Sequence, residues 1–414
     1  MVQILLEGLR ADARFEVHHV DARVSDDLED VGSFRPQKFI RLFKCILQAW
    51  WIRLRHGSMA FYYVPAPAKR PAIMRDWVVM ALCRPLFPEL ILHWHAYGLG
   101  EWVVEGKDWH RKLTRWALGK ADLSIVLNNY NKRDAAVFAP KRIEVVPNGI
   151  ADQFPDYETA LAPKREARAA TLRALEEPAA KVGRWEGGKA GRLESEGVEE
   201  MRRGEELERV RFLFLGHLIE TKGVFVAIEA TGLVNDELRK AGAGWRAHLT
   251  LAGGFASEEE KARVMAAIEE ANSVGKKCEG GRVGKWEGTD AADNEGVCVE
   301  LAGFLVAGQK KSALEKADCL VFPTFYENEA QPLVLLEAMS AGLPMITTSW
   351  RGVGESLPEV YPYVVEPKSS LSLAGAMVRI CESDCHSELR CQYADAFTIP
   401  THICRAANVI RSNT

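Results

Sequence analysis

The chain of 414 residues contains no apolar run that approaches the roughly 20 residues a membrane-spanning helix needs. Its nine cysteines are scattered and odd in number, and Cys381 and Cys385 form only a C-x-x-x-C pair. This spacing argues against a zinc site and favours reduced thiols in a cytoplasmic protein. The net charge of −4 provides no basic excess, so we expect no nucleic-acid partner.

The length and the 47% apolar content are enough for two ordinary hydrophobic cores. Short apolar segments alternate with helical stretches, which predicts an α/β fold with parallel, doubly wound sheets. The expected strands are 14–20, 58–64, 90–95, 121–127, 142–147, 210–215, 249–254, 299–305, 320–324 and 345–348. Asn148-Gly149 is a turn signal that closes the first domain.

The most informative feature is a pair of glutamates, Glu329 and Glu337, eight positions apart. Glu329 follows a predicted strand and a polar loop, and Glu337 lies in a predicted helix over 332–341 that ends at Gly342-Leu343-Pro344. A helix N-terminus attracts an anion, while carboxylates accept hydrogen bonds from hydroxyls. The combination suits a nucleotide sugar, although two incidental glutamates on an amphipathic helix are the simpler interpretation.

Residues 318–358 resemble the signature region of glycosyltransferase family 4, the retaining nucleotide-sugar transferases of GT-B fold. The resemblance includes the loop, both glutamates, the Ala-Gly-Leu-Pro stop at 341–344 and Gly352-Val-Gly-Glu355. It implies two Rossmann-like, doubly wound domains that face a cleft. It also implies that Glu329 holds hydroxyls of the transferred sugar and that Glu337 binds the ribose.

The family has a glycine-rich segment where this chain has Ala330-Gln331-Pro332, and Pro332 has no N–H to donate. Gly216 and the segment after it resemble Gly-Arg-Leu-x-x-x-Lys-Gly, in which the arginine and lysine neutralise the diphosphate. Lys222 matches the lysine, whereas His217 replaces the arginine and lacks its bidentate fork. Gly303 and Phe304 match the loop whose backbone meets the nucleotide base.

The resemblance implies an N-terminal acceptor domain over 1–150 and a C-terminal nucleotide-sugar domain over 210–392. A terminal helix over 393–414 is expected to return to the N-terminal domain. The chain begins with a predicted helix over 1–10, so we expect the first strand and glycine-rich turn of the family's N-terminal domain to be missing. His93 and His95 share one face at a strand end, where the family places a histidine near the donor sugar. His95 is the candidate site residue, and a packed core histidine is the alternative.

Two polar segments interrupt this plan. We interpret 151–209 as a linker with an insertion, helical around 163–175, because 181–210 contain fifteen charged residues and six glycines. Residues 272–296 form a second polar insertion. Each carries a similar hexapeptide, at 182–187 and 283–288. Surface expansion is the simpler explanation, and a partner contact through its tryptophan is the alternative.

A predicted helix over 37–55 combines basic residues with an aromatic, apolar face. Such a helix can lie on anionic lipid, which would place the protein peripherally on the inner face of a membrane. The same periodicity fits a core-facing helix of any α/β domain. The apolar positions are Phe39, Leu42, Phe43, Ile46, Trp50 and Leu54.

The sequence therefore predicts a retaining hexosyltransferase that uses a nucleotide diphosphate sugar and a hydroxyl acceptor, either a glycan, a lipid-linked acceptor or a small molecule. The resemblance implies that neither a metal nor another cofactor is needed, and the chain has no Asp-x-Asp triplet of the kind that metal-dependent glycosyltransferases use. A degenerate, non-catalytic nucleotide-sugar-binding protein is an open alternative. A sugar-nucleotide 2-epimerase fits less well, because the Ala-Gly-Leu-Pro segment and the pair Glu329 and Glu337 resemble a transferase more closely. A glycogen-phosphorylase-like enzyme also fits less well, since no counterpart of its pyridoxal phosphate lysine is evident.

Overall fold

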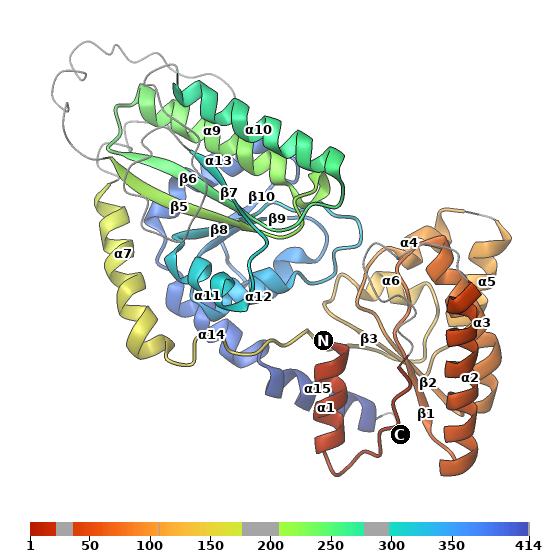
Figure 1. Ribbon diagram of the computed structural model, residues 1–414. Helices are drawn as coiled ribbons and strands as arrows, with labels where there is room; N and C mark the ends of the chain where they lie inside the picture. Colours follow the sequence, from red (N-terminus) through yellow and green to blue (C-terminus); the bar gives the residue numbers. More distant parts are fainter. Residues whose placement is uncertain (22–35, 107, 176–206, 277–297, 413–414) are drawn as a thin grey trace. The chain divides into compact units, whose positions relative to one another are not determined.

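The computed structural model describes residues 1–21, 36–106, 108–175, 207–276 and 298–412. They form two compact units (Figure 1). Unit 1 consists of Met1–Ala151, Glu327–Pro332 and Asp395–Thr414, and unit 2 consists of Asp152–Tyr326 and Leu333–Ala394. Each unit contains one parallel sheet with helices packed on it, which confirms the predicted α/β class.

The sheet of unit 1 has the strand order β1-β2-β3-β4. Alternate residues of β2 enter two different cores: Leu90 and Leu92 pack with α3, α4 and α5, whereas Ile91 packs with α1 and α15. The sheet is therefore covered on both faces, although its described strands follow one another without the reversal of order that a doubly wound sheet shows. The strands are β1 Ala60–Tyr63, β2 Glu89–His93, β3 Leu123–Val126 and β4 Ile143–Val145.

The helices of unit 1 follow the apolar periodicity of the sequence. In α2, for example, Leu42, Ile46 and Ile52 are buried on one side. The helices are α1 Val2–Ala11, α2 Pro36–His56, α3 Arg70–Cys83, α4 Leu99–Val104, α5 Trp109–Leu118, α6 Lys132–Ala136 and α15 Ile399–Arg411, with a 3-10 turn at Arg84–Leu86.

Three sequence predictions for unit 1 are wrong. Residues 14–20 do not form a strand: Phe15 and Val17 pack on the core of α1 and α15, but the backbone joins no ladder of the described sheet. Phe43 and Leu54 of α2 do not face the core, because they are 56% and 83% exposed. The terminal segment is two helices rather than one. Thr398 caps α15 through its side chain and Pro400 follows, which starts a new helix after α14 has ended.

The sheet of unit 2 has the order β10-β9-β8-β5-β6-β7. The order reverses between β5 and β8, which pair directly through Phe212 and Leu213. This is the topological switch point of a doubly wound sheet, where loops diverge and open α/β sheets bind ligands. The strands are β5 Glu208–Leu215, β6 Trp245–Ala252, β7 Val299–Gly303, β8 Cys319–Phe322, β9 Met345–Thr348 and β10 Val364–Val365.

Figure 1 shows α9, α10 and α13 over one face of this sheet and α7, α11 and α12 over the other. The helices are α7 Ala162–Ala174, α9 Val224–Lys240, α10 Glu258–Lys276, α11 Ala307–Lys316, α12 Leu333–Ser340, α13 Ser370–Arg379 and α14 His386–Ala396. Shorter turns lie at Tyr157–Leu161 (π-helical), Glu220–Lys222, Val353–Ser356 and Ile380–Glu382.

Two buried charged groups, Arg165 and Asp318, fix α7 on the face of the unit 2 sheet that also carries α11 and α12. Arg165 is 4% exposed and donates to the carbonyl oxygens of Leu314 and Ala317, at the end of α11, and of Ala341. Asp318 accepts hydrogen bonds from Arg168 and Arg211. Burial alone would raise the pKa of Asp318, but the two arginines outweigh it and hold that pKa below its usual value.

In the described part of the chain, no helix is both long and apolar enough to cross a bilayer. The hexapeptides at 182–187 and 283–288, and nearly all of the two polar segments that contain them, lie outside the described residues.

Candidate functional site

In unit 2, the loops that follow β5 and β8 meet at the switch point. Phe325 N donates to Thr221 O at 2.8 Å, which joins the two loops through their backbones. Gly223 has φ +84°, and a Cβ at this position would lie 2.2 Å from Pro323 O. A glycine is required for this close approach, because any side chain would separate the loops. Gly223 also precedes the first residue of α9, so the junction lies at the positive end of a helix.

Lys222 lies at this junction. Its Nζ lies 4.8 Å from the ring centroid of Tyr326 and 5.5 Å from that of Phe322. Two aromatic faces therefore orient the ammonium group. A positioned cation at a helix N-terminus is suited to a diphosphate. His217 lies on the same loop and is exposed.

Three glycines end the neighbouring strands β5, β6 and β7. Gly216 N donates to Ala252 O at 3.0 Å, and Gly253 N donates to Gly303 O at 2.8 Å. A Cβ on Gly253 would lie 1.7 Å from Gly216 O. The carboxyl edge of this sheet is thus built from closely packed backbone, and Gly216 and Gly303 both belong to it.

Glu337 pairs with a residue that the sequence did not indicate. Its Oε1 accepts a hydrogen bond from Lys310 Nζ at 2.6 Å, which links α12 to α11. Lys310 also lines a pocket of about 750 Å³ beside the loop that follows β7. Phe304 lines the same pocket and is 78% exposed. An exposed aromatic ring and a carboxylate that is oriented by a lysine match what a nucleoside requires, a stacking surface and a hydroxyl acceptor.

The segment Glu327–Pro332 is part of unit 1, where it contacts loops at the carboxyl ends of three strands. Asn128, after β3, donates from Nδ2 to Ala330 O at 2.7 Å. Asn148, after β4, donates from its backbone N–H to Gln331 Oε1 at 2.7 Å. Tyr97, after β2, donates from its backbone N–H to Asn328 O. Two of these contacts hold backbone carbonyls of the segment, on either side of Glu329, and the third holds the Gln331 side chain.

Glu329, Ala330, Gln331 and Pro332 are all buried, and Glu329 is 9% exposed. Gln331 Oε1 accepts the Asn148 backbone N–H, which is a contact within unit 1. Pro332 directly precedes α12, where its missing N–H interrupts no hydrogen bond of the helix.

Three histidines lie together near the carboxyl edge of the unit 1 sheet. The rings of His93 and His95 are 4.1 Å apart, and His93 Nδ1 contacts the Tyr62 hydroxyl. His402, on α15, bonds through Nδ1 to Pro147 O at 2.7 Å. Burial lowers the pKa of His95 to about 4 and that of His93 well below its usual value. Burial also lowers the pKa of His402, so all three rings are neutral near pH 7.

The buried Nε2 atoms of these histidines have no hydrogen-bond partner among the described residues. For His93, which is fully buried, this fits the core role that the sequence offered as the alternative. His95 is half-buried, so its neutral imidazole can offer a hydrogen bond to a ligand.

Asp134, which the sequence did not single out, caps the first turn of α4. It accepts from the backbone N–H groups of Gly98, Gly100 and Glu101. Burial raises the pKa of Asp134 to about 6. The sequence also did not indicate Asn128, Asn148 and Lys310. Their hydrogen-bond partners, like those of Asp134, are distant in the sequence, so no local pattern marks these residues.

A second pocket, of about 620 Å³, lies at the opposite edge of the unit 1 sheet. Leu90, Asp122 and Lys141 line it at the amino ends of β2, β3 and β4. None of the predicted site residues borders this pocket, so we assign it no role in the site.

Comparison with known proteins gives one family match and several similar structures. Residues 209–383 match the family described as glycosyl transferases group 1. No curated protein sequence gives a significant match. Among solved structures, sucrose-phosphate synthase from Thermosynechococcus elongatus has a TM-score of 0.61 at 16% identity, covering 99% of this chain and 92% of that one.

Two further structures are similar. HepE of Anabaena, in complex with UDP and glucose, has a TM-score of 0.57 at 14% identity and covers 92% of this chain and 84% of its own. A UDP-forming α,α-trehalose-phosphate synthase from Burkholderia xenovorans has a TM-score of 0.57 at 12% identity, with 92% and 80% covered. The two parallel-sheet units and these neighbours show a GT-B fold, and with the match over 209–383 they support a GT-B glycosyltransferase.

Proposed function

We propose that the protein is a retaining hexosyltransferase that moves a hexosyl group from a nucleotide diphosphate sugar to a hydroxyl acceptor. The observation that carries the proposal is the junction of the β5 and β8 loops, where Lys222 lies over two aromatic rings beside the N-terminus of α9. A fixed ammonium group and a helix dipole stabilise the charge that develops on a departing diphosphate.

The other residues of the candidate site would contact the rest of the nucleotide sugar. Glu337 accepts hydrogen bonds from the ribose, and Phe304 with Gly303 borders the base. A carboxylate has two oxygens and about four lone-pair positions, so the bond from Lys310 leaves capacity for two ribose hydroxyls. Glu329 orients the transferred sugar, and His95 offers a neutral imidazole to it. Gly216 and His217 border the diphosphate.

The proposed reaction retains the anomeric configuration. The acceptor hydroxyl attacks the anomeric carbon on the face from which the diphosphate departs, and a phosphate oxygen of the leaving group takes the hydroxyl proton. No side chain is then needed as a general base. Lys222 neutralises the leaving group, so the proposed step uses no metal.

The test is a thermal-shift screen against UDP, GDP and ADP sugars, followed by an assay for released nucleotide diphosphate. HepE was crystallised with UDP and with UDP-glucose, so UDP sugars come first. A ligand that binds the folded state raises the melting temperature, and at 100 times Kd it adds about 2.7 kcal/mol of stability. The absence of a shift with every donor would contradict the proposal. The anomeric configuration of the product, read by NMR, tests retention.

A non-catalytic nucleotide-sugar-binding protein is the second candidate. It is favoured by two residues, His217 in place of an arginine and Pro332 without a backbone N–H at the start of α12. This candidate predicts donor binding without release of nucleotide diphosphate. Release that depends on Glu329 and Lys222 would exclude it, and a product with inverted configuration at the sugar C2 would indicate the epimerase.

We also propose that α2 contacts anionic lipid, which would bring the protein to a lipid-linked acceptor. Large apolar side chains are exposed along one stripe of this helix, with basic residues such as Lys44 and Arg55 beside them. An exposed apolar stripe with flanking cations matches a negatively charged bilayer surface. The exposed apolar residues are Ile40 (57%), Phe43 (56%), Leu47 (44%), Trp51 (58%) and Leu54 (83%).

Co-sedimentation with liposomes, with and without anionic lipid, tests this contact. We expect salt-sensitive binding that is lost when Phe43 and Leu54 are both replaced by serine. Val360 is 88% exposed in unit 2, and Val360→Ser is the matched control. Equal recovery in the supernatant with both lipid compositions would contradict the proposed membrane contact.

A further inference from the structure

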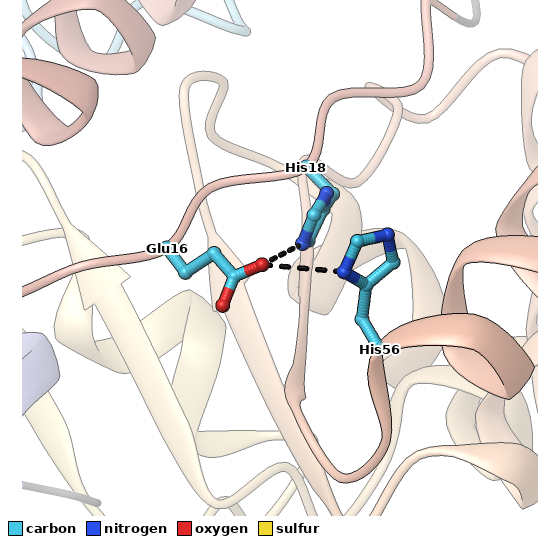
Figure 2. Close-up of side chains that lie close together, drawn as sticks. All are labelled: Glu16, His18 and His56. Carbon is cyan, nitrogen blue, oxygen red and sulfur yellow. Dashed lines mark hydrogen bonds and ion pairs between the residues drawn. The ribbon is translucent and has the colours of Figure 1, made fainter.

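A cluster of three metal-ligating side chains lies in unit 1, at the end of α2 and outside the residues proposed to bind the nucleotide sugar. Glu16 and His18 belong to the irregular segment after α1, and His56 is the last residue of α2. Figure 2 shows both imidazole rings directed toward the same carboxylate oxygen. Among the described residues, this is where three His, Cys, Asp or Glu side chains bring their ligand atoms within 4.8 Å of one another.

The distances suit a small ion. Glu16 Oε1 lies 2.9 Å from His18 Nε2 and 3.2 Å from His56 Nδ1, and the ring centroids are 3.9 Å apart. Ligands at about 2.0–2.1 Å around a tetrahedral Zn²⁺ are separated by about 3.3 Å. The two ring nitrogens lie within 4.8 Å of each other, so side-chain rotations could bring all three donor atoms to such separations.

The donor set also identifies the class of ion. Two imidazole nitrogens and one carboxylate oxygen are the ligands of three-residue zinc sites, with the fourth position open to water. The side chains of His18 and His56 are 22% and 29% exposed, whereas that of Glu16 is 76% exposed. The two rings are thus largely held by the protein, and the carboxylate faces solvent, from which an ion can enter.

The electrostatic setting favours a cation. His56 ends α2, a helix of 21 residues, and the C-terminal end of a helix carries a partial negative charge. Two arginines share this last turn, and their guanidinium groups contact groups outside the cluster: Arg53 donates to Leu86 O at 2.7 Å, and Arg55 lies over the Trp51 ring.

We propose that Glu16, His18 and His56 bind a divalent transition-metal ion, with Zn²⁺ the best match, that fastens the segment after α1 to the end of α2. Four residues further on, β1 begins, so the ion lies at the amino edge of the sheet, opposite the carboxyl edge that carries His95 and the Glu327–Pro332 segment. The ion would join these two segments with water as its fourth ligand, and it is separate from the proposed sugar transfer.

The segment that the ion would fasten is already in contact with α2. Cys45 Sγ donates to Asp21 O at 3.4 Å, and Val20 packs on the cluster that contains Leu42 and Ile46. The segment and the helix therefore lie side by side, so binding of the ion would require little rearrangement. This arrangement predicts that metal raises the melting temperature of the protein.

The experiment measures zinc binding to the purified chain after it has been stripped with EDTA. Bound zinc is counted by equilibrium dialysis with elemental analysis, and affinity is obtained by competition with a chromophoric chelator. We expect about one Zn²⁺ per wild-type chain and a rise in melting temperature on addition of ZnCl₂. Co²⁺ in place of Zn²⁺ should give the visible absorption of a tetrahedral or five-coordinate site.

Single variants Glu16→Gln, His18→Gln and His56→Gln should each weaken Zn²⁺ binding at least about tenfold and remove the thermal shift. His19→Gln is the matched control, because His19 is an exposed histidine next to His18 and outside the cluster. Glu16→Gln removes a largely exposed charge, so it tests the site even where a histidine variant folds poorly. Equal affinity in wild type and Glu16→Gln, or an equal loss in His19→Gln, would overturn the proposal.

Discussion

Glu337 Oε1 accepts a hydrogen bond from Lys310 Nζ at 2.6 Å, and Lys310 lines the pocket beside Phe304. The carboxylate proposed to bind the ribose is therefore held in place by a lysine on a different helix. A sequence motif indicates Glu337, whereas no motif indicates Lys310.

Glu337→Gln should weaken binding of the nucleotide sugar by about tenfold, or ~1.4 kcal/mol. The amide keeps the shape of the side chain but loses the charge that strengthens hydrogen bonds to ribose and orients Lys310. Isothermal titration calorimetry with a donor that shifts the melting temperature measures the change. Glu315→Gln, on α11 but outside the pocket, should retain wild-type affinity. Equal affinities of the two variants would contradict the assignment of Glu337.

Lys222→Met should lower kcat by about 10²–10³, because a charge aimed at the leaving group acts mainly in the transition state. Methionine retains an apolar stem against Phe322 and Tyr326, so the junction of loops should remain folded. Steady-state kinetics with the preferred donor separates the effect on kcat from that on KM. Lys261→Met, which removes a half-exposed lysine on α10, is the control. An unchanged kcat would exclude Lys222 from the proposed chemistry.

Several strands were readily predicted because short apolar segments end at turn residues. The predicted 345–348 coincides with β9, and 320–324 differs from β8 by one or two residues at its ends. The prediction of a strand at 14–20 was wrong. The alternation of Phe15 and Val17 with polar residues indicates that one side of the segment packs on the core, but it does not show whether a partner strand is present. Thr398 and Pro400 are a helix-start signal that marks the break between α14 and α15. The prediction of one terminal helix overlooked this signal because the apolar periodicity continues across it.

For the candidate site, the sequence located residues with local signatures and missed those with distant partners. Lys222 and Gly223 were found through a short motif, and the structure adds the two aromatic rings and the approach to Pro323. Asn128 bonds to Ala330, 202 positions away, so no window of sequence could connect them. Periodicity alone also left open which side of α2 faces solvent, because apolar residues lie on both sides.

His95 should make folding stability depend on pH. Burial lowers its folded pKa to about 4, against about 6.5 in an unfolded chain. Above pH 6.5 both states are neutral and the stability is full. As the pH falls from about 6.5 toward 4, the unfolded state takes up a proton that the folded state refuses, so stability is lost by up to about 1.4 kcal/mol per pH unit. Urea unfolding across this range should show a shallower decline for His95→Gln, and identical slopes would argue against a buried neutral ring.

Asp318→Asn should lower the free energy of unfolding by about 3–5 kcal/mol, because Arg168 and Arg211 would lose the buried carboxylate that pairs with both. The lowered pKa of Asp318 means that this stabilisation is present above the unfolded pKa and is lost as the pH falls through the folded one. Asp384→Asn is the control, because that carboxylate is 82% exposed and its pair with Arg173 spans 3.7 Å. We expect the control to change stability by less than about 0.5 kcal/mol.

Gly253 and Gly254 offer a matched test of the glycine-built edge of the unit 2 sheet. A Cβ at Gly253 would lie 1.7 Å from Gly216 O, at a φ of +156°, whereas a Cβ at Gly254 would meet no atom within 4 Å. Gly253→Ala must therefore separate the ends of β5 and β6, at a cost of about 1–3 kcal/mol or more, while Gly254→Ala should be near neutral. Because Gly216 belongs to the proposed diphosphate site, Gly253→Ala should also weaken donor binding. Chemical denaturation and calorimetry on both variants measure the two effects, and equal stability of the two would show that these strand ends tolerate a side chain.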